Sequence, residues 1–437
     1  MAKKLARLMR PFEEFFKHQV AGGVVLLATA VLALILANSP FSQDYFHFWE
    51  IELSFGTETF GLTKSLHHWI NDGLMAIFFF VVGLEIKREF LAGELASAKK
   101  AALPIAGAIG GMLAPALIFF IINPSGLESR GWGIPMATDI AFALGIIALL
   151  GNRITRSVAI FLTALAIVDD LGAVLVIAIF YTSDINFIAM TVGVFCLSFL
   201  VIGNRLGIQH PNFYALVGFA LWVALLKSGI HASVAGVLIG ATIPVQPKHN
   251  HDQFLERAES LMTRIREMGS TSGPFHKNEK MGNLLALEHI THDAMSPLQR
   301  MEHEMHHWVI FCVMPIFALA NAGISMSMSE FTTAISSPVT IGVTLGLLIG
   351  KPVGITLIAW IAVKFKLAHL PENTRWREIF GVGILAGIGF TMSMFITNLA
   401  YPDPHMVANA KVGIFIASLL AGVIGYIFLS KNRPHHF

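Results

Sequence analysis

The stretch TALAIVDDLGAVLVIAIF, residues 163–180, carries two adjacent aspartates inside an otherwise apolar run. Around Asp169 and Asp170 nearly every residue is Ala, Ile, Leu or Val. The run is close to the ~20 residues with which a helix crosses the hydrocarbon core of a bilayer. Whether it belongs to a globular core or to a membrane span therefore decides the fold.

Composition places this run in a membrane. Hydrophobic residues make up 55% of the chain and charged residues only 13%, against roughly a quarter charged in soluble domains. We therefore predict an all-α polytopic membrane protein whose surroundings are the lipid bilayer. The formal net charge of +2 argues against a nucleic-acid partner. Cys196 and Cys312 both fall in apolar runs, which excludes a disulfide framework and a CxxC metal site.

The apolar runs predict about 12 transmembrane helices. They lie at about 19–37, 66–86, 101–122, 129–150, 156–181, 185–203, 212–227, 229–244, 307–325, 340–363, 379–399 and 409–430. The first run follows a basic start that could pass for a secretory signal, but its length and the spans behind it favour an uncleaved helix. We predict a single transmembrane transporter domain over 1–437, with an extended cytoplasmic loop at 245–306.

The Lys and Arg residues indicate the orientation, because cytoplasmic loops collect them. With the N-terminus inside, all but five of the 30 Lys and Arg residues fall on the cytoplasmic side. The exceptions are the external Lys64, Arg130, Lys227 and Lys411, and Lys351 within a span. Both termini are therefore predicted to be cytoplasmic.

A small external β-hairpin is predicted at 49–62, WEIELSFGTETFGL. Ile51, Leu53 and Phe55 alternate with polar residues, and Gly56 with Thr57 offers a turn. An irregular loop fits this pattern nearly as well.

The cytoplasmic loop contains an amphipathic pattern, DQFLERAESLMTRIREM at 252–268. Its apolar residues recur at helical spacing, which predicts a helix that lies on the membrane or packs on a partner helix. The stretch GSTSGP, 269–274, then ends it.

Four ionisable residues lie near the middle of predicted spans: Asp139, Asp169, Asp170 and Lys351. A charge at mid-bilayer costs ~2.5–3.5 kcal/mol on insertion scales, so such residues usually have a function. A buried ion pair that only fixes helix packing is the alternative, but one ammonium cannot neutralise three carboxylates. Asp72, nearer a span end, and His231, at the start of a short span, are weaker candidates.

Helix geometry explains the doublet. Adjacent residues on an α-helix point about 100° apart, so one carboxylate can line a hydrated cavity while the other meets a cation on a neighbouring helix. Such a site binds either a proton or a hard monovalent cation such as sodium or lithium. Competition between two ions for one site is sufficient for exchange transport.

Two spans are predicted to be broken. The stretch 131–145 places Pro135, Thr138 and Asp139 in mid-span, and 381–395 contains four glycines followed by Thr391 and Ser393. Interrupted spans in both halves of a transporter indicate a mid-membrane ion site. Close helix packing is the alternative explanation for the glycines.

Seven motifs resemble the NhaA family of bacterial sodium/proton antiporters, in order from about residue 18 to 430. They are WINDGLMAIFFFVVGLEIKREF, PMATDIAFALGIIALLG, LTALAIVDDLGAVLVIAIFYT, GIHASVAGVLIGATIP, FALANAGI, GKPVGI and GIGFTMSMF. The resemblance implies inverted repeats formed by spans 3–5 and 10–12, with spans 4 and 11 broken and crossing. It also implies a bacterial inner-membrane protein with no cofactor.

The resemblance assigns roles within the membrane. Asp170 would be the principal sodium ligand, with Thr138 a possible ligand, and Asp169 would pair with Lys351 when sodium is absent. Asp139 and Lys351 would balance the ends of the broken helices. The family exports Na+ or Li+ in exchange for a greater number of incoming H+, and this exchange is electrogenic.

The resemblance also implies activation at alkaline pH through a cytoplasmic cluster. The matching positions are Glu85, Arg88, Glu89, Glu302, His303 and His306, and histidine titrates near pH 6.5. The 245–306 loop is longer than the family needs, which leaves the pH profile open. Its histidines could equally be solvated, or form an adventitious metal site at His303, His306 and His307. The hairpin at 49–62 matches the region through which family members form homodimers.

Two other functions compete with antiport. An intramembrane aspartyl protease needs two carboxylates on different helices, and here the doublet shares one helix. A sodium-coupled solute symporter of similar fold would need a larger polar and aromatic pocket than Thr, Asp and small residues provide.

Overall fold

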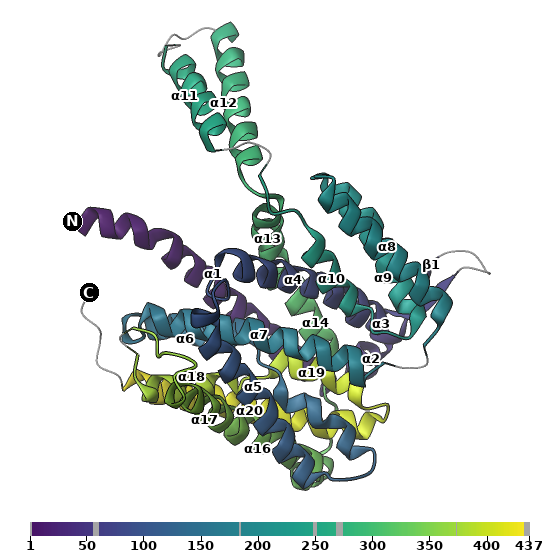
Figure 1. Cartoon of the computed structure of the whole chain (residues 1–437). Coiled ribbons are helices and arrows are strands. Elements are labelled where there is room, and N and C mark those ends of the chain that lie inside the picture. The colour runs from purple at the N-terminus through teal and green to yellow at the C-terminus, as the bar shows by residue number, and fades with distance from the viewer. Residues whose placement is uncertain are drawn as a thin grey trace.

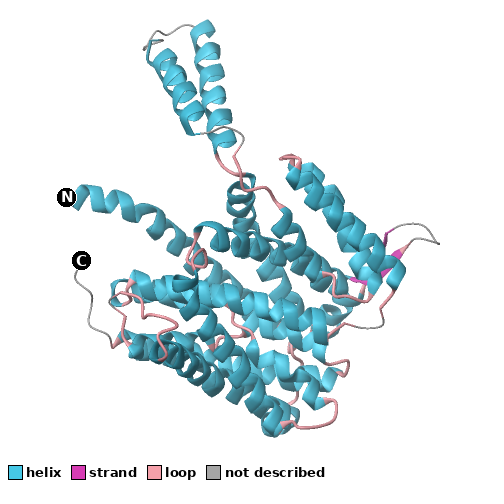
Figure 2. Cartoon of the chain, in the orientation of Figure 1, coloured by secondary structure: helices cyan, strands magenta, loops and turns pink. Residues whose placement is uncertain are grey.

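The computed structural model describes residues 2–55, 61–182, 185–247, 251–267, 274–372 and 374–431. Almost all of them are helical (Figures 1 and 2). In these ranges nine helical segments are long and apolar enough to cross a membrane, and the bent pair α18–α19 adds a tenth. The spans predicted at 229–244 and 307–325 correspond to the short α10 and to α13–η4–α14, so the number of spans stays a prediction.

The N-terminal half runs as follows. Its elements are α1 (Ala2–Ala37), α2 (Ser42–Glu50), β1 (Glu52–Phe55), β2 (Leu62–Ser65), α3 (Leu66–Trp69), the π-helical turn η1 (Ile70–Leu74), α4 (Met75–Ala92), α5 (Ala98–Ile122), the 3-10 helix η2 (Glu128–Met136), α6 (Ile140–Leu150), η3 (Gly151–Arg153), α7 (Arg156–Phe180), α8 (Phe187–Arg205), α9 (Pro211–Ser228) and α10 (Ser233–Thr242).

The remaining elements complete the chain. They are α11 (His251–Glu267), α12 (Pro274–Ala294), α13 (Pro297–Trp308), the π-helical turn η4 (Val309–Val313), α14 (Met314–Asn321), α15 (Met328–Ser336), α16 (Pro338–Leu345), the π-helical turn η5 (Gly346–Gly350), α17 (Lys351–Lys364), α18 (Trp376–Ala386), α19 (Phe390–Ala400) and α20 (Pro404–Ser430). Prolines open α9, α16 and α20, where the missing N–H would have had no partner in the helix.

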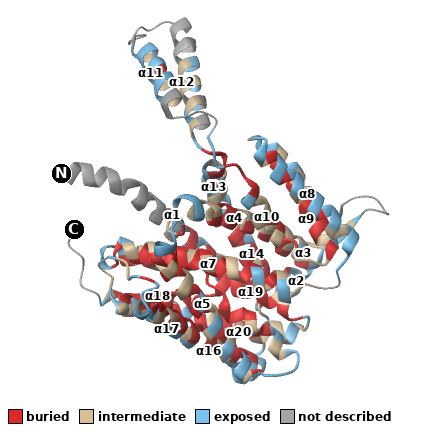
Figure 3. Cartoon of the chain, in the orientation of Figure 1, coloured by how far each residue is buried: buried red, intermediate tan, exposed pale blue. Residues whose placement is uncertain are grey.

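Two groups of helices build the membrane part. The repeat group contains α5, η2, α6 and α7 from one repeat and α16, η5, α17, α18, α19 and α20 from the other. We call the helices α1, α4, α8, α9, α10 and α14, which lie outside the two repeats, the flanking group; α1 of this group also packs against α6 of the repeat group. Buried residues concentrate in the repeat group, whereas α8 exposes most of its side chains (Figure 3).

The tightest contact within the repeat group joins α5 and α17. Gly110 on α5 and Gly354 on α17 approach so closely that a Cβ on either residue would overlap the carbonyl oxygen of the other. Glycine therefore sets the separation of these helices, as small residues do in membrane interfaces generally. The contact fixes the height at which α17 presents Lys351.

The β-hairpin is confirmed, its external side stays a prediction, and its predicted bounds were wrong. β1 and β2 pair antiparallel, with Leu53 opposite Lys64 and Ser54 opposite Thr63. The pair thus extends to Ser65, whereas Trp49 and Glu50 still belong to α2. The predicted turn at Gly56 and Thr57 lies outside the described residues.

The long loop after α10 contains a helical hairpin that projects from the bundle (Figure 1). α11 includes the predicted amphipathic helix up to Glu267, and it packs against α12. Leu261 is buried in this pair, so packing on a partner helix describes α11 better than an isolated membrane-surface helix. Met268 and the predicted break at 269–273 lie outside the described residues.

Candidate functional site

Helix α7 places the two aspartates deep in the repeat group. The helix begins where the hydroxyl of Thr155 accepts a hydrogen bond from Val158 N–H, and it continues through the apolar run without interruption. Asp169 and Asp170 are each only 2% exposed. Their directions differ by about 100° because they are consecutive on one helix, so they meet different surroundings.

Asp169 pairs with Lys351 of the other repeat. Lys351 Nζ donates to Asp169 Oδ2 at 2.6 Å and to Thr138 Oγ1 at 2.8 Å, and Lys351 itself is 0% exposed. The π-helical turn η5 immediately precedes this lysine. Such turns often mark functional sites, because the extra residue changes the direction of the side chains that follow.

The two broken spans cross beside this pair. After η2 the chain is extended at 137–139, and the helix pair α18–α19 bends by 49° at its own break. The crossing segments are joined by hydrogen bonds, from Thr138 Oγ1 to Ala386 O at 3.0 Å and from Asp139 N to Ile388 O at 2.7 Å. The predicted breaks and their crossing are confirmed.

Asp139 lies at the N-terminal ends of two half-helices. Its Oδ1 accepts from Phe142 N at 3.3 Å in α6, and its Oδ2 accepts from Thr391 N at 3.1 Å and Thr391 Oγ1 at 2.5 Å in α19. A carboxylate at this position balances the positive ends of both helices. From the sequence, Thr391 was noted only as a polar residue after the glycines. Its hydrogen bonds to Asp139 could not be predicted, because they form only where the two broken spans cross.

The site keeps a carboxylate oxygen that no group among the described residues satisfies. Asp169 Oδ1 is buried without a hydrogen-bond partner, and the neighbouring Asp170 carboxylate is buried to the same extent. Thr138 Oγ1 lies at the same junction. Buried polar atoms are nearly always paired in proteins, and oxygen-rich sites at broken helices coordinate Na+ or H+ in transporters. These oxygens fit a monovalent cation or a proton as the transported species.

Charge balance points the same way. Asp139, Asp169 and Asp170 carry two negative charges more than Lys351 can neutralise when all four are ionised. An uncompensated charge in a dry interior costs several kcal/mol. Binding of a sodium ion or of protons removes that cost, so the same carboxylates favour either ion.

The predicted cluster of charged residues forms around Arg88 at the end of α4. Arg88 Nη1 lies 2.5 Å from Glu302 Oε1, and Arg88 Nη2 lies 2.9 Å from Glu89 Oε1. His306 Nδ1 lies 3.5 Å from Glu85 Oε1. Burial raises the pKa of Glu302 to about 7, although Arg88 opposes the shift.

One predicted member of the cluster lies elsewhere. His303 is exposed on α13, and its ring packs against His307 with 5.7 Å between centroids. Asp72 Oδ1 and His231 Nε2 lie 3.5 Å apart and pair with each other. Among the described residues, His, Cys, Asp and Glu form no group that could hold a resident metal ion.

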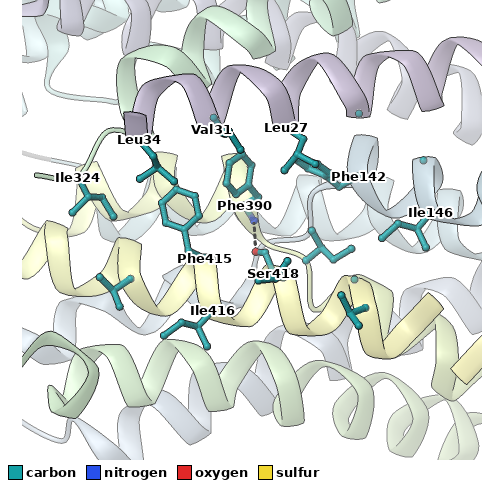
Figure 4. Close-up of a pocket in the computed structure, with 18 of the residues that line it drawn as sticks. Leu27, Val31, Leu34, Phe142, Ile146, Ile324, Phe390, Phe415, Ile416 and Ser418 are labelled. Atoms are coloured by element: carbon teal, nitrogen blue, oxygen red, sulfur yellow. Dashed lines mark hydrogen bonds between the residues drawn. The ribbon is translucent and has the colours of Figure 1, made fainter. Parts of the chain in front are cut away.

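A separate apolar cavity of about 1090 Å³ lies between α1, α6 and α20. Its lining includes Phe390, the first residue of α19, whose N–H donates to Ser418 Oγ at 3.2 Å (Figure 4). None of Asp139, Asp169, Asp170 and Lys351 lines it. The cavity is therefore not the polar and aromatic pocket that a solute symporter would need.

Two crossing broken helices around buried carboxylates define a secondary ion transporter of the inverted-repeat class. The profile of the family Na+/H+ antiporter 1 matches residues 13–429. The chain belongs to this family, and sodium/proton antiport is its function.

Curated relatives agree over nearly the full length. The Na(+)/H(+) antiporter NhaA 2 of Syntrophotalea carbinolica is 62% identical and spans 99% of this chain and 98% of that protein. The antiporter NhaA of Acidithiobacillus ferrooxidans is 49% identical with 97% of each chain covered, and NhaA 1 of Saccharophagus degradans is 46% identical with 98% and 93% covered. The predicted resemblance is confirmed. The protein is a secondary transporter and no enzyme, needs no cofactor, and transports Na+ and H+.

Proposed function

We propose that this antiporter exports Na+ or Li+ from the cytoplasm in exchange for a larger number of H+, so that each cycle moves charge. One observation carries the proposal. Among the described residues, Asp169 offers a buried oxygen without a hydrogen-bond partner while Lys351 occupies the other oxygen, and Asp170 follows on the same helix without an ion pair. With one proton on Asp170 and one on Lys351, binding of one monovalent cation by the two carboxylates can release two protons, which supports an exchange ratio above one.

In the proposed cycle Asp170 gives up its proton and binds the cation first, and Thr138 adds its hydroxyl oxygen. Asp169 then turns from Lys351 toward the cation, Lys351 loses its proton, and both protons leave to the cytoplasmic side. Once the cation is released outside, one incoming proton returns to Asp170 and one to Lys351, and the 2.6 Å pair between Asp169 and Lys351 re-forms. Asp139 stays with Thr391 throughout, because it balances the two helix ends.

Liposomes with an acidic interior test this proposal. We expect external sodium or lithium to collapse the pH gradient, potassium to leave it unchanged, and Asp170→Asn to abolish the response. Asp44→Asn, which changes an exposed aspartate of α2, is the matched control and should transport normally. The number of protons exchanged per sodium ion is calculated from the membrane potential that sodium-driven exchange generates. A wild-type protein without sodium-dependent proton movement from about pH 6 to pH 9, a range around the histidine pKa, would overturn the proposal.

The cluster around Arg88 is proposed to make transport depend on pH. Its support is Glu302, whose pKa of about 7 lies close to physiological pH because of burial. Above that pH the ionised carboxylate strengthens the attraction to Arg88, which joins α13 to α4. α4 is one of the helices that flank the ion site, and Glu85 on it interacts electrostatically with Asp170.

The β1–β2 pair is proposed to form a homodimer, because a two-stranded sheet has two unpaired edges that can add strands from another chain. Ile51 and Leu53 are also exposed there. Leu53→Glu should lower the dimer fraction measured by light scattering in detergent. Ile185→Glu, at an exposed apolar residue between α7 and α8, should not. Equal dimer fractions in both variants would contradict a hairpin-mediated dimer.

We also propose the bacterial inner membrane as the location, with both termini in the cytoplasm. The Lys and Arg distribution supports this orientation. Fusions of alkaline phosphatase or green fluorescent protein to the C-terminus test it, since only the fluorescent protein should be active there.

A further inference from the structure

The second half of the broken span, α19, contacts the flanking group through one face. Phe395 and Asn398 are three residues apart on this helix, so they point in similar directions. Asn398 Nδ2 donates to Asn321 Oδ1 of α14 at 2.6 Å. Phe395 is 0% exposed and lies against residues of α4, α14 and the segment before α10.

Asn321 connects α19 to a wider polar network. Its Oδ1 also accepts from His67 Nε2 at 3.0 Å, and its Nδ2 donates to Asn71 Oδ1 at 2.9 Å. Asn321 is 0% exposed, so each of these bonds replaces water. His67 and Asn71 follow β2 in the chain, which places the network on the side of the β1–β2 pair.

An aromatic layer lies one turn deeper. The ring of Phe395 is 5.3 Å from that of His231, 5.7 Å from that of Phe79 and 6.2 Å from that of Phe317, measured between centroids. These three partners all belong to elements outside the repeat group. His231 in turn faces Asp72. Asp72 and His231, the two weaker candidates for functional residues in the sequence analysis, therefore border this layer.

Both layers cross the boundary between the two helix groups. The ion-site residues Asp169 and Lys351 lie on α7 and α17 of the repeat group, together with α19. Transporters of this class expose a fixed site to each side by movement of one group of helices against the other. Such a movement must separate Asn398 from Asn321 and Phe395 from its three partners.

We propose that Phe395 and Asn398 form the gate that closes the ion site toward the hairpin side, which is the external side. The inference rests on the antiport function and on the proposed orientation. The hydrogen bond between the side-chain amides of Asn398 and Asn321, called the latch below, holds the gate closed. The aromatic layer around Phe395 excludes water. Neither residue contacts the transported ion, so both act by setting which side of the membrane reaches the site.

Chemical labelling tests the gate without requiring transport. In a background with Cys196→Ser and Cys312→Ser, Met392→Cys on α19 reports access, since Met392 lies one turn deeper than Phe395 on a similar face of the helix and is 1% exposed. Right-side-out vesicles are treated with a small, membrane-impermeant thiol reagent. Asn398→Ala should raise the labelling rate about tenfold, because loss of one buried hydrogen bond shifts a two-state equilibrium by about that factor.

The matched control is Asn409→Ala. Asn409 also uses its side-chain amide, which donates to Ser337 Oγ at 3.3 Å, but both of its partner elements belong to the repeat group. Its labelling rate should equal that of the parent. Equal rates in Asn398→Ala and the parent would overturn the gate, whatever the transport activity of either protein.

A disulfide cross-link tests the same gate, and it also reports folding, because the two positions lie close together only in the folded protein. Asn321→Cys with Asn398→Cys, in the same background, should form a disulfide on oxidation and lose sodium/proton exchange. Reduction should restore exchange. Full exchange by the cross-linked protein would contradict the gate. Loss of exchange in the reduced protein as well would mean that Asn321 and Asn398 do more than allow the helices to move apart.

Discussion

Lys351 neutralises only one face of the Asp169 carboxylate. Nζ lies 2.6 Å from Oδ2, and Oδ1 remains buried without a hydrogen-bond partner among the described residues. The pair thus joins the two repeats while it leaves an oxygen for a cation. A structural ion pair would be expected to satisfy both oxygens, because a half-paired carboxylate in a dry interior is costly.

The first prediction concerns this pair. Lys351→Met should lower the free energy of unfolding by about 3–5 kcal/mol, because it leaves Asp169 uncompensated. Adding Asp169→Asn should restore part of the loss, since the buried charge is then removed. Thermal unfolding in detergent measures both effects. Lys364→Met, at the exposed end of the same helix, is the control and should change little. A double variant less stable than Lys351→Met would contradict the pairing.

The second prediction concerns the anchor of the two half-helices. Thr391→Val keeps the side-chain shape but removes the hydroxyl that donates to Asp139 at 2.5 Å. Hydrogen bonds to charged groups contribute ~1.5–3 kcal/mol, so the unfolding free energy should fall by about that amount. Thr344→Val loses a bond to a neutral carbonyl, Gly413 O, at 3.3 Å and should cost less. Equal losses would mean that Asp139 does not depend on Thr391.

The third prediction is a pH dependence. The pKa of Glu302 is raised by burial from 4.5 to about 7, so folding favours its protonated form. This contribution is fully present below pH 4.5 and is lost as the pH rises through about 7. Glu302→Gln should therefore flatten the dependence of unfolding free energy on pH in that window, as followed by thermal unfolding at a series of pH values.

The same variant should make the rise of exchange activity across pH 7 shallower, because glutamine cannot gain the charge that attracts Arg88. Glu304→Gln, at an exposed residue of the same helix, should retain both wild-type profiles. Identical pH profiles for Glu302→Gln and Glu304→Gln would remove Glu302 from the proposed switch.

Much of the site could be predicted from the sequence, because its residues are of types that are unfavourable inside an apolar membrane helix. Charges, proline and glycine inside apolar spans predicted the doublet, the lysine and both breaks. Contacts between distant segments could not be predicted in this way. The bonds from Asp139 to Thr391 and from Asn398 to Asn321 exist only because helices far apart in sequence cross, and single polar residues in apolar spans were their only signal.

Local geometry limited the prediction elsewhere. The π-helical turn at 346–350 consists of Gly, Leu and Ile, which are equally compatible with an ordinary helix. α12 was missed because its apolar residues do not follow one face, and packing against α11 compensates. The hairpin bounds were wrong because Leu62, Thr63 and Lys64 carry a weaker alternation than the first strand.

The last prediction tests what holds Lys351 in place. Gly110→Ala should destabilise the protein by at least the ~1–3 kcal/mol typical of overpacking, because the new Cβ overlaps the carbonyl of Gly354, which is backbone and cannot rotate away. Lys351 lies one turn before Gly354, so exchange should fall as α17 shifts. Gly282→Ala in α12, where a Cβ meets nothing, should preserve both stability and exchange. Unchanged unfolding of Gly110→Ala would mean that the close approach of α5 and α17 does not set the height of the lysine.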